Sequence, residues 1–130
     1  MHRELLLAAL ASLAGSTASA QDPVKVDPQH YKVAFENEQV RVLRVHFGPH
    51  EKSVMHAHPD GVAIFLSDAH NRSTLPDGKT MERSGKAGDS QWVPAATHQP
   101  ENLLDTPLDA ILVELKPKPT SGKSVTAPAK

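Results

Sequence analysis

Cysteine is absent from this chain of 130 residues, and aromatic side chains make up only 4% of it. Without cysteine the fold has no disulfide, no thiolate metal ligand and no cysteine nucleophile, so its stability must come from a core, a bound ion or an oligomeric contact. The few aromatic residues offer no platform on which nucleic-acid bases could stack. The net charge of −1 includes no basic or acidic block, so the sequence predicts neither a nucleic-acid partner nor a membrane-surface partner.

Helical periodicity is missing beyond the first twenty residues, where no stretch places apolar side chains at i, i+3, i+4 and i+7. Short strand-like runs recur instead at intervals of about eight to twelve residues, separated by turns rich in glycine and proline. The pattern predicts an all-β protein, a sandwich or barrel, with one domain over residues 28–116.

The first twenty residues have the features of a secretory signal peptide. A weakly basic start precedes the apolar run Leu5–Leu13, and the small residues Ala18-Ser19-Ala20 form a cleavage signature before Gln21. The alternatives are an amphipathic terminal helix or, if cleavage fails, a membrane anchor, but the apolar run is too short to span a bilayer comfortably. We therefore expect residues 1–20 to be removed and the protein to be exported, periplasmic or secreted, with no membrane attachment.

Both flanks of the domain are expected to lack regular structure. Residues 21–27 contain Pro23 and lead to Pro28, and prolines oppose helix, so this segment is predicted to be an extended lead-in. Residues 117–130 contain Lys, Pro, Ser, Thr, Gly and Ala with hardly an apolar side chain to bury, so the tail is predicted to be disordered.

Alternation of apolar residues assigns faces to several predicted strands. Tyr31, Val33 and Phe35 are expected to share one face. The run 39–47 carries apolar residues in both phases, which indicates either a bulge or burial on both sides. In the last strand, Leu108–Leu115, the odd-numbered residues from 111 onward are expected to share a face. Trp92 and Phe65 are expected mainly in the core, with pocket lining as the alternative.

Eight histidines are many for a chain of this length. His56 and His58 stand two apart in a strand-like segment, so both side chains would project from the same face. If the fold brings His98 opposite them, three imidazoles converge, which is a metal site in outline. Four others share no spacing with this trio and are expected as solvated surface residues: His30, His46, His50 and His70.

The order of these residues resembles the two motifs of the cupin family. Gly48 precedes the pair His56-Ala57-His58, as in the first motif with a slightly longer spacer. The second motif has counterparts in order: Gly88, Pro94, His98 and Asn102. The resemblance implies a single jelly-roll-like cupin β-barrel. It also implies a homodimer, with the segment Val24–Phe35 as the candidate for edge-strand exchange.

Departures from the family pattern concern the metal shell. The glutamate that commonly follows the histidine pair is replaced by Val62 and Ala63, neither of which binds a metal. In the second motif Ala96 replaces a glycine and His98 comes one residue early. The trailing glycine of the first motif is absent as well. The resemblance therefore implies a three-histidine site formed by His56, His58 and His98.

Three neutral imidazoles suit a divalent ion such as Fe, Mn, Ni, Cu or Zn and leave positions open for water or substrate. A site without the carboxylate leaves the ion with more of its own charge, which weakens retention but favours an anion in the open position. Asp60 and Glu101 are the candidates to restore a carboxylate. Asn102 and Gln91 are the candidates for contacts to substrate or to the ligands. The alternative is that the three histidines line the barrel and bind an organic ligand without metal.

Three functions remain open. Cupins with three histidines and no carboxylate resemble thiol dioxygenases, which implies a metal-dependent oxidoreductase acting on a small molecule. No arginine or tyrosine is placed by motif to hold a substrate carboxylate, which counts against that reading. The alternatives are a non-catalytic periplasmic module that binds a metal or a small ligand, and a barrel whose metal site has decayed.

Overall fold

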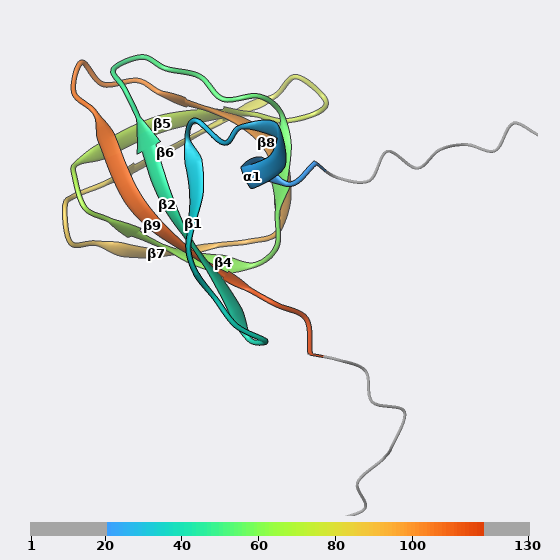
Figure 1. The fold of residues 1–130 in the computed structure, drawn as a ribbon. Helices are drawn as coiled ribbons and strands as arrows, with labels where there is room; N and C mark the ends of the chain where they lie inside the picture. Colours follow the sequence, from blue (N-terminus) through green and yellow to red (C-terminus); the bar gives the residue numbers. More distant parts are fainter. Residues whose placement is uncertain (1–20, 119–130) are drawn as a thin grey trace, which may run out of the picture.

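The computed structural model describes residues 21–118 (Figure 1). The predicted signal peptide and residues 119–130 of the predicted tail lie outside these residues. The described part contains one short helix and nine strands, and its helix is far too short to cross a membrane. The elements are α1 Pro23–Val26, β1 Tyr31–Glu36, β2 Val40–Phe47, β3 His56–His58, β4 Gly61–Phe65, β5 Ala69–Thr74, β6 Thr80–Gly85, β7 Ser90–Val93, β8 Ala96–Asn102 and β9 Leu108–Leu115.

The strands form two antiparallel sheets that close into a barrel, as the sequence predicted (Figure 1). The larger sheet has the order β1-β2-β9-β4-β7, and the smaller has the order β3-β8-β5-β6. Strands that are distant in the chain therefore lie side by side, such as β2 with β9 and β3 with β8. The second of these pairings brings the two histidine segments together.

The core lies between the sheets and is supplied mainly by β2 and β9, whose inward phases alternate with an outward phase. Pairing of β2 with β9 runs without a register shift from Val40 to Phe47. The second apolar phase of β2, Val40 and Val42, therefore does not result from a bulge in this strand; both residues are half-buried on its outward face. The buried apolar residues are Tyr31, Leu43, Val45, Phe47, Phe65, Ala69, Leu108, Ala110 and Leu112.

A bulge does occur in β1, and it makes the predicted common face of this strand wrong. Val33 pairs with Leu43 and Phe35 with Val42, so one extra residue lies between the two pairs. The extra residue moves Phe35 to the opposite face. Tyr31 is consequently buried, whereas Phe35 is 54% exposed.

The lead-in is not extended throughout, because residues 23–26 form the helical turn α1. The side chain of Asp22 accepts a hydrogen bond from Val24 N at 2.9 Å and caps the turn, and Pro23 occupies its first position. A capping aspartate followed by proline is a standard helix start. Pro23 therefore favours a helix in this position and does not oppose it. The turn packs against β1 and β3.

The outer face of the larger sheet carries a row of directly opposed apolar residues that crosses all five strands. The members of the row are Phe35, Val42, Val113, Val62 and Trp92. Trp92 is 54% exposed at the β7 edge, so its predicted place in the core is wrong, whereas Phe65 does lie in the core. The predicted homodimer stays a prediction.

Candidate metal centre

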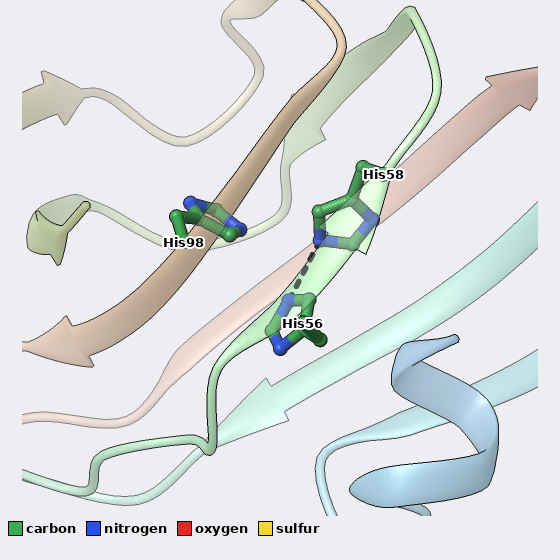
Figure 2. Close-up of side chains that lie close together, drawn as sticks. All are labelled: His56, His58 and His98. Carbon is green, nitrogen blue, oxygen red and sulfur yellow. Dashed lines mark hydrogen bonds between the residues drawn. The ribbon is translucent and has the colours of Figure 1, made fainter. Parts of the chain in front are cut away.

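Pairing of β3 with β8 places His56 directly opposite His98. His58 lies two residues further along β3, so its side chain projects from the same face as that of His56. Figure 2 shows the three imidazoles turned toward one another from the two strands. One nitrogen from each ring lies within 4.8 Å of the others, a separation compatible with binding a metal ion.

His56 is fully buried, and its orientation is fixed by the chain that precedes it. Its Nδ1 lies 2.8 Å from the carbonyl oxygen of Val54 and 3.3 Å from Ser53 Oγ. A carbonyl oxygen only accepts hydrogen bonds, so Nδ1 carries the ring proton and Nε2 has the free lone pair. Burial lowers the pKa of His56 to about 4, with a further contribution from His58, so the ring is neutral near pH 7.

His58 is oriented by a buried carboxylate on β9. Its Nδ1 donates to Glu114 Oε2 at 2.9 Å, and Glu114 is only 2% exposed. Arg41 Nε donates to the other carboxylate oxygen at 2.7 Å, and the same guanidinium contacts both oxygens of Asp22 at 2.7 and 2.9 Å. Burial acts to raise the pKa of Glu114, but hydrogen bonds from His58 and Arg41 keep it below its usual value.

His98 is oriented by Ser73 of β5, whose Oγ lies 2.9 Å from Nδ1. Its other nitrogen, Nε2, is buried and has no hydrogen-bond partner among residues 21–118. Burial, together with the neighbouring His58 and His56, lowers the pKa of His98 to about 3, so this ring is also neutral. An unpaired polar atom at a buried position is destabilising unless something binds it.

The facing nitrogens of the trio fit a cation. Nε2 of His56 and Nε2 of His58 are 2.9 Å apart, and both rings already use Nδ1 as the donor to an oxygen. Two lone pairs that face each other at this distance repel, and His98 Nε2 adds a third without a partner. A divalent ion bound by the three Nε2 atoms would satisfy all three. The donor set therefore fits the group that the cupin resemblance implied.

A cavity of about 390 Å³ lies between the sheets beside the trio. His58 and His98 contribute to its wall, whereas His56 does not. The ring of Tyr31 also lines the cavity and packs edge-on against His56, with ring centroids 4.9 Å apart. An ion bound to the trio would therefore have its open side toward a space large enough for a small organic molecule.

Two of the four further candidates from the sequence form hydrogen bonds with the backbone of segments that connect strands. Asn102 is 1% exposed and its amide donates to the carbonyl oxygens of Gly48 and Thr106, at 3.1 and 2.9 Å. Asp60 accepts a hydrogen bond from Ala95 N at 2.7 Å. Neither side chain contacts the three imidazoles, although Asn102 also contributes to the cavity wall.

The other two candidates lie near the cavity but away from the trio. Glu101 lines the cavity and pairs with Arg72 at 3.6 Å. Gln91 accepts a hydrogen bond from Arg83 Nη1 at 3.0 Å and donates to the carbonyl oxygen of Ser84 at 2.8 Å. Neither Glu101 nor Asp60 completes the ion's shell, because the group of ligand atoms contains only the three histidines within residues 21–118.

Sequence reasoning missed the residues that support the trio. Glu114 is a carboxylate in the same phase as Leu108, Ala110 and Leu112, which are the buried residues of β9. A charged residue in a buried phase is the signal that identifies it, because such a residue requires a partner.

His30 was also placed wrongly, since it is 7% exposed rather than solvated. Its Nδ1 lies 2.7 Å from Asp27 Oδ2, its Nε2 contacts Glu51, and its ring stacks on Phe47. Ser53 Oγ donates to Asp27 and lies near His56, so this cluster supports the first ligand of the trio.

No protein-family model matches the chain, and no curated protein matches it in sequence. Solved structures do match. A cupin domain from Bordetella pertussis Tohama I is 25% identical, with a TM-score of 0.61 over 67% of this chain and 92% of that one. A double-stranded β-helix protein from Klebsiella pneumoniae is 21% identical, with a TM-score of 0.53 over 70% and 78% of the two chains. A cupin family protein from Methanocaldococcus jannaschii is 17% identical, with a TM-score of 0.52 over 65% and 77%. The chain therefore has the cupin, or double-stranded β-helix, fold.

Proposed function

We propose that this cupin barrel binds a divalent transition-metal ion through Nε2 of His56, His58 and His98, and that a small molecule binds beside the ion in the cavity. The observation that carries the proposal is the unpaired convergence of the three Nε2 atoms, since every Nδ1 already contacts an oxygen. Three neutral nitrogen ligands suit Fe, Ni, Cu or Zn better than the oxygen-preferring Mn.

Glu114 supplies the negative charge that the missing motif glutamate would have supplied at the ion. It contacts His58 through Nδ1 rather than pointing into the ligand set, so its charge acts through the imidazole. Such a carboxylate–histidine pair raises the basicity of the ligand and fixes its orientation. The bound ion would act as a Lewis acid toward a ligand in the open position. The residues of this chain would hold the ion, and the apolar cavity would exclude water.

Two versions of this function differ in whether a reaction follows binding. A metal-dependent oxidoreductase is the first, and it requires the cavity beside His58 and His98. A non-catalytic module that captures a small ligand is the second. The second is favoured by the absence of a free acid or base beside the trio within residues 21–118, since the carboxylates that line the cavity lie close to basic side chains. Glu101 pairs with Arg72 and Glu82 lies 3.7 Å from His70.

Metal analysis tests the premise that both versions share. The wild-type protein, purified without chelator and then reloaded, should hold about one ion per chain. Replacement of all three trio histidines by alanine should abolish binding. The matched control replaces three histidines outside the trio by alanine: the exposed His46 and His50 and the half-buried His70. Equal metal content in the wild-type and trio variants would refute the proposal.

Oxygen uptake then separates enzyme from binder. The Fe(II)-loaded wild-type protein is tested with small thiols and hydroxylated aromatic compounds, and the trio variant is the background. Uptake that depends on the trio supports the oxidoreductase. Binding of a compound without uptake supports the module.

Export also remains a proposal. Gln21, the first residue after the predicted cleavage site, uses its carbonyl oxygen to accept a hydrogen bond from Ala57 N, between the paired histidines, at 2.9 Å. N-terminal sequencing of protein from the periplasmic fraction tests the cleavage, and a start at Gln21 is expected.

A further inference from the structure

The cavity beside the trio has mainly apolar walls, and one arginine side chain also lines it. Side chains from both sheets form the walls, among them Val45, Phe65, Leu75, Val93 and Leu112. The volume of about 390 Å³ lies within the usual range for small-molecule sites. Arg83 of β6 is the arginine that lines this space.

Arg83 is held by one nitrogen and keeps its other donors free. Its Nη1 donates to Gln91 Oε1 at 3.0 Å and to the carbonyl oxygen of Trp92 at 3.2 Å. Within residues 21–118 no carboxylate forms an ion pair with it, in contrast to Arg41 and Arg72. A guanidinium has five N–H donors, so Nε and Nη2 remain for a ligand. Anchoring through Nη1 reduces the entropy that ligand binding would otherwise remove.

Asn71 of β5 lies directly opposite Arg83 in the strand register and lines the same cavity. Its neighbour on the other side, Asn102, has both amide donors committed to carbonyl oxygens. The Asn71 side chain has no hydrogen-bond partner within residues 21–118. Arg83 and Asn71 therefore present adjacent free donors to the cavity.

The charges around the cavity restrict the ligand to one negative charge. Glu82 and Glu101 also line the cavity, and although each lies near a basic side chain, both disfavour additional negative charge on a ligand. A dianion such as a phosphate monoester would meet one free cation and two carboxylates. A monoanion with an apolar body matches both the single guanidinium and the apolar walls.

Building on the proposed metal site, we propose that the cavity binds a small organic acid, with its carboxylate on Arg83 and Asn71 and its apolar body between the sheets, next to His58 and His98. Gln91 is the positioning residue of this subsite, because it holds Arg83 through Nη1. The subsite belongs to the protein with or without a bound ion.

Acids and their neutral amides of the same shape test the proposal: benzoate against benzamide, and hexanoate against hexanamide. Calorimetric titrations are made with metal-free protein and with Zn²⁺-loaded protein. At least one acid should bind the metal-free wild type about tenfold to a hundredfold more tightly than its amide. Arg83→Gln should remove this preference by weakening acid binding more than amide binding, and it should leave the metal content unchanged. Arg83→Lys should restore part of it, because it keeps the charge without the fork.

Arg44→Gln is the matched control, because Arg44 is an exposed arginine of β2 on the larger sheet. Equal affinity for both acids and their amides, or an unchanged preference in Arg83→Gln, overturns the subsite. Metal content is measured separately on the same samples. If the protein prefers the acid but never holds metal, the subsite is supported and the metal site is refuted. If the protein binds metal but does not prefer the acid, the metal site is supported and the subsite is refuted.

Discussion

Two kinds of buried histidine lie close together in this barrel, and they differ in what the second ring nitrogen meets. Both nitrogens of His30 contact carboxylates, those of Asp27 and Glu51. In the trio, each Nδ1 contacts an oxygen, but each Nε2 meets another imidazole or nothing. Ser53 links the two groups, since it donates to Asp27 and lies 3.3 Å from His56 Nδ1.

The hydrogen bonds of His30 are therefore complete, as expected of a structural residue, whereas the trio has ring nitrogens that are free to bind a ligand. Burial would lower the pKa of His30, but the hydrogen bonds that its ring donates to Glu51 and Asp27 raise it, so its charged form is stabilised. Burial lowers the pKa of His56 although its hydrogen bond to Val54 and the nearby carboxylates of Asp27 and Glu114 oppose this, and it lowers the pKa of His98 with no opposing contact. Burial alone therefore does not identify a metal ligand. The proposed metal site rests instead on the unpartnered second nitrogens, and the following variants test that distinction.

Replacement of His30 by alanine should have the largest effect on the fold. It leaves the buried Asp27 without its charged partner and removes the ring that stacks on Phe47. Breaking a buried charged pair destabilises by about 3 kcal/mol. Urea denaturation of the metal-free variant measures this loss. The number of metal ions bound per folded chain should stay at the wild-type value. A loss of bound metal in proportion to the loss of stability would contradict the distinction between His30 and the three histidines of the trio.

His98→Ala should give the opposite result. The variant removes the buried unpaired Nε2, so the metal-free protein should unfold within about 1 kcal/mol of the wild type. Zinc at a hundred times its dissociation constant should stabilise the wild type by about 2.7 kcal/mol and the variant hardly at all. Denaturation with and without zinc measures both quantities. A large loss of stability without metal would show that His98 is a structural residue.

Glu114→Gln should weaken the site without emptying it. The amide keeps the shape but removes the charge that orients His58, and loss of such a partner lowers metal affinity by about tenfold to a hundredfold. Competition with a metal chelator measures the affinity. Glu101→Gln is the control, because that carboxylate pairs with Arg72 away from the trio. Equal metal affinities for both variants would show that Glu114 does not contribute to metal binding.

The sequence was sufficient to predict that the three histidines lie together, because the spacing within each of the two segments is local. A period of two places His56 and His58 on one face, and the second motif places His98 after a turn. The supporting residues were not predictable in the same way. Glu114 meets His58 through the pairing of β4 with β9 and the closure of the barrel, and the chain distance of 56 residues carries no local signal.

Other errors came from single residues that override a pattern. One extra residue in β1 moved the Phe35 side chain to the opposite face of the strand. A capping aspartate before Pro23 produced a helical turn where an extended segment was expected. Trp92 was assigned to the core from its type, but the edge position of β7 leaves it exposed. In each case the local context decided the conformation, and average residue preferences did not.

The stability of the metal-free protein should depend on pH in opposite directions for the two classes. His30 has a raised pKa, so its stabilisation is complete below about 6.5 and is lost as the pH rises through its folded value. His56 and His98 have pKa values of about 4 and about 3, so their burial weakens the fold as the pH falls below 6.5. Each histidine contributes up to about 1.4 kcal/mol per pH unit.

Urea denaturation between pH 5 and pH 8 tests these signs on metal-free protein, within roughly the range where histidine titrates. His98→Ala should flatten the loss of stability on the acid side. His30→Ala should steepen the rise of stability with pH, because it removes a group that acts against this rise. Identical slopes for both variants would contradict the assignment of opposite pKa directions.

Asp22→Asn should have the smallest effect and traces how far the support of the trio extends. Asparagine caps a helix as well as aspartate does, so α1 should be retained while Arg41 loses one of its two carboxylate partners. Arg41 then holds Glu114 less firmly, and metal affinity should fall by less than about tenfold, since Asp22 acts through two further side chains.

A double-mutant cycle makes this last effect specific. In the Glu114→Gln background, Asp22→Asn should have no further effect on metal affinity, because the route from Asp22 to His58 passes through that carboxylate. Additive losses would mean that Asp22 acts on the trio by another route. The alternative is the hydrogen bond from Ala57 to the carbonyl oxygen of the neighbouring Gln21. The cycle therefore distinguishes a charge that orients one ligand from a segment that simply holds β3 in place.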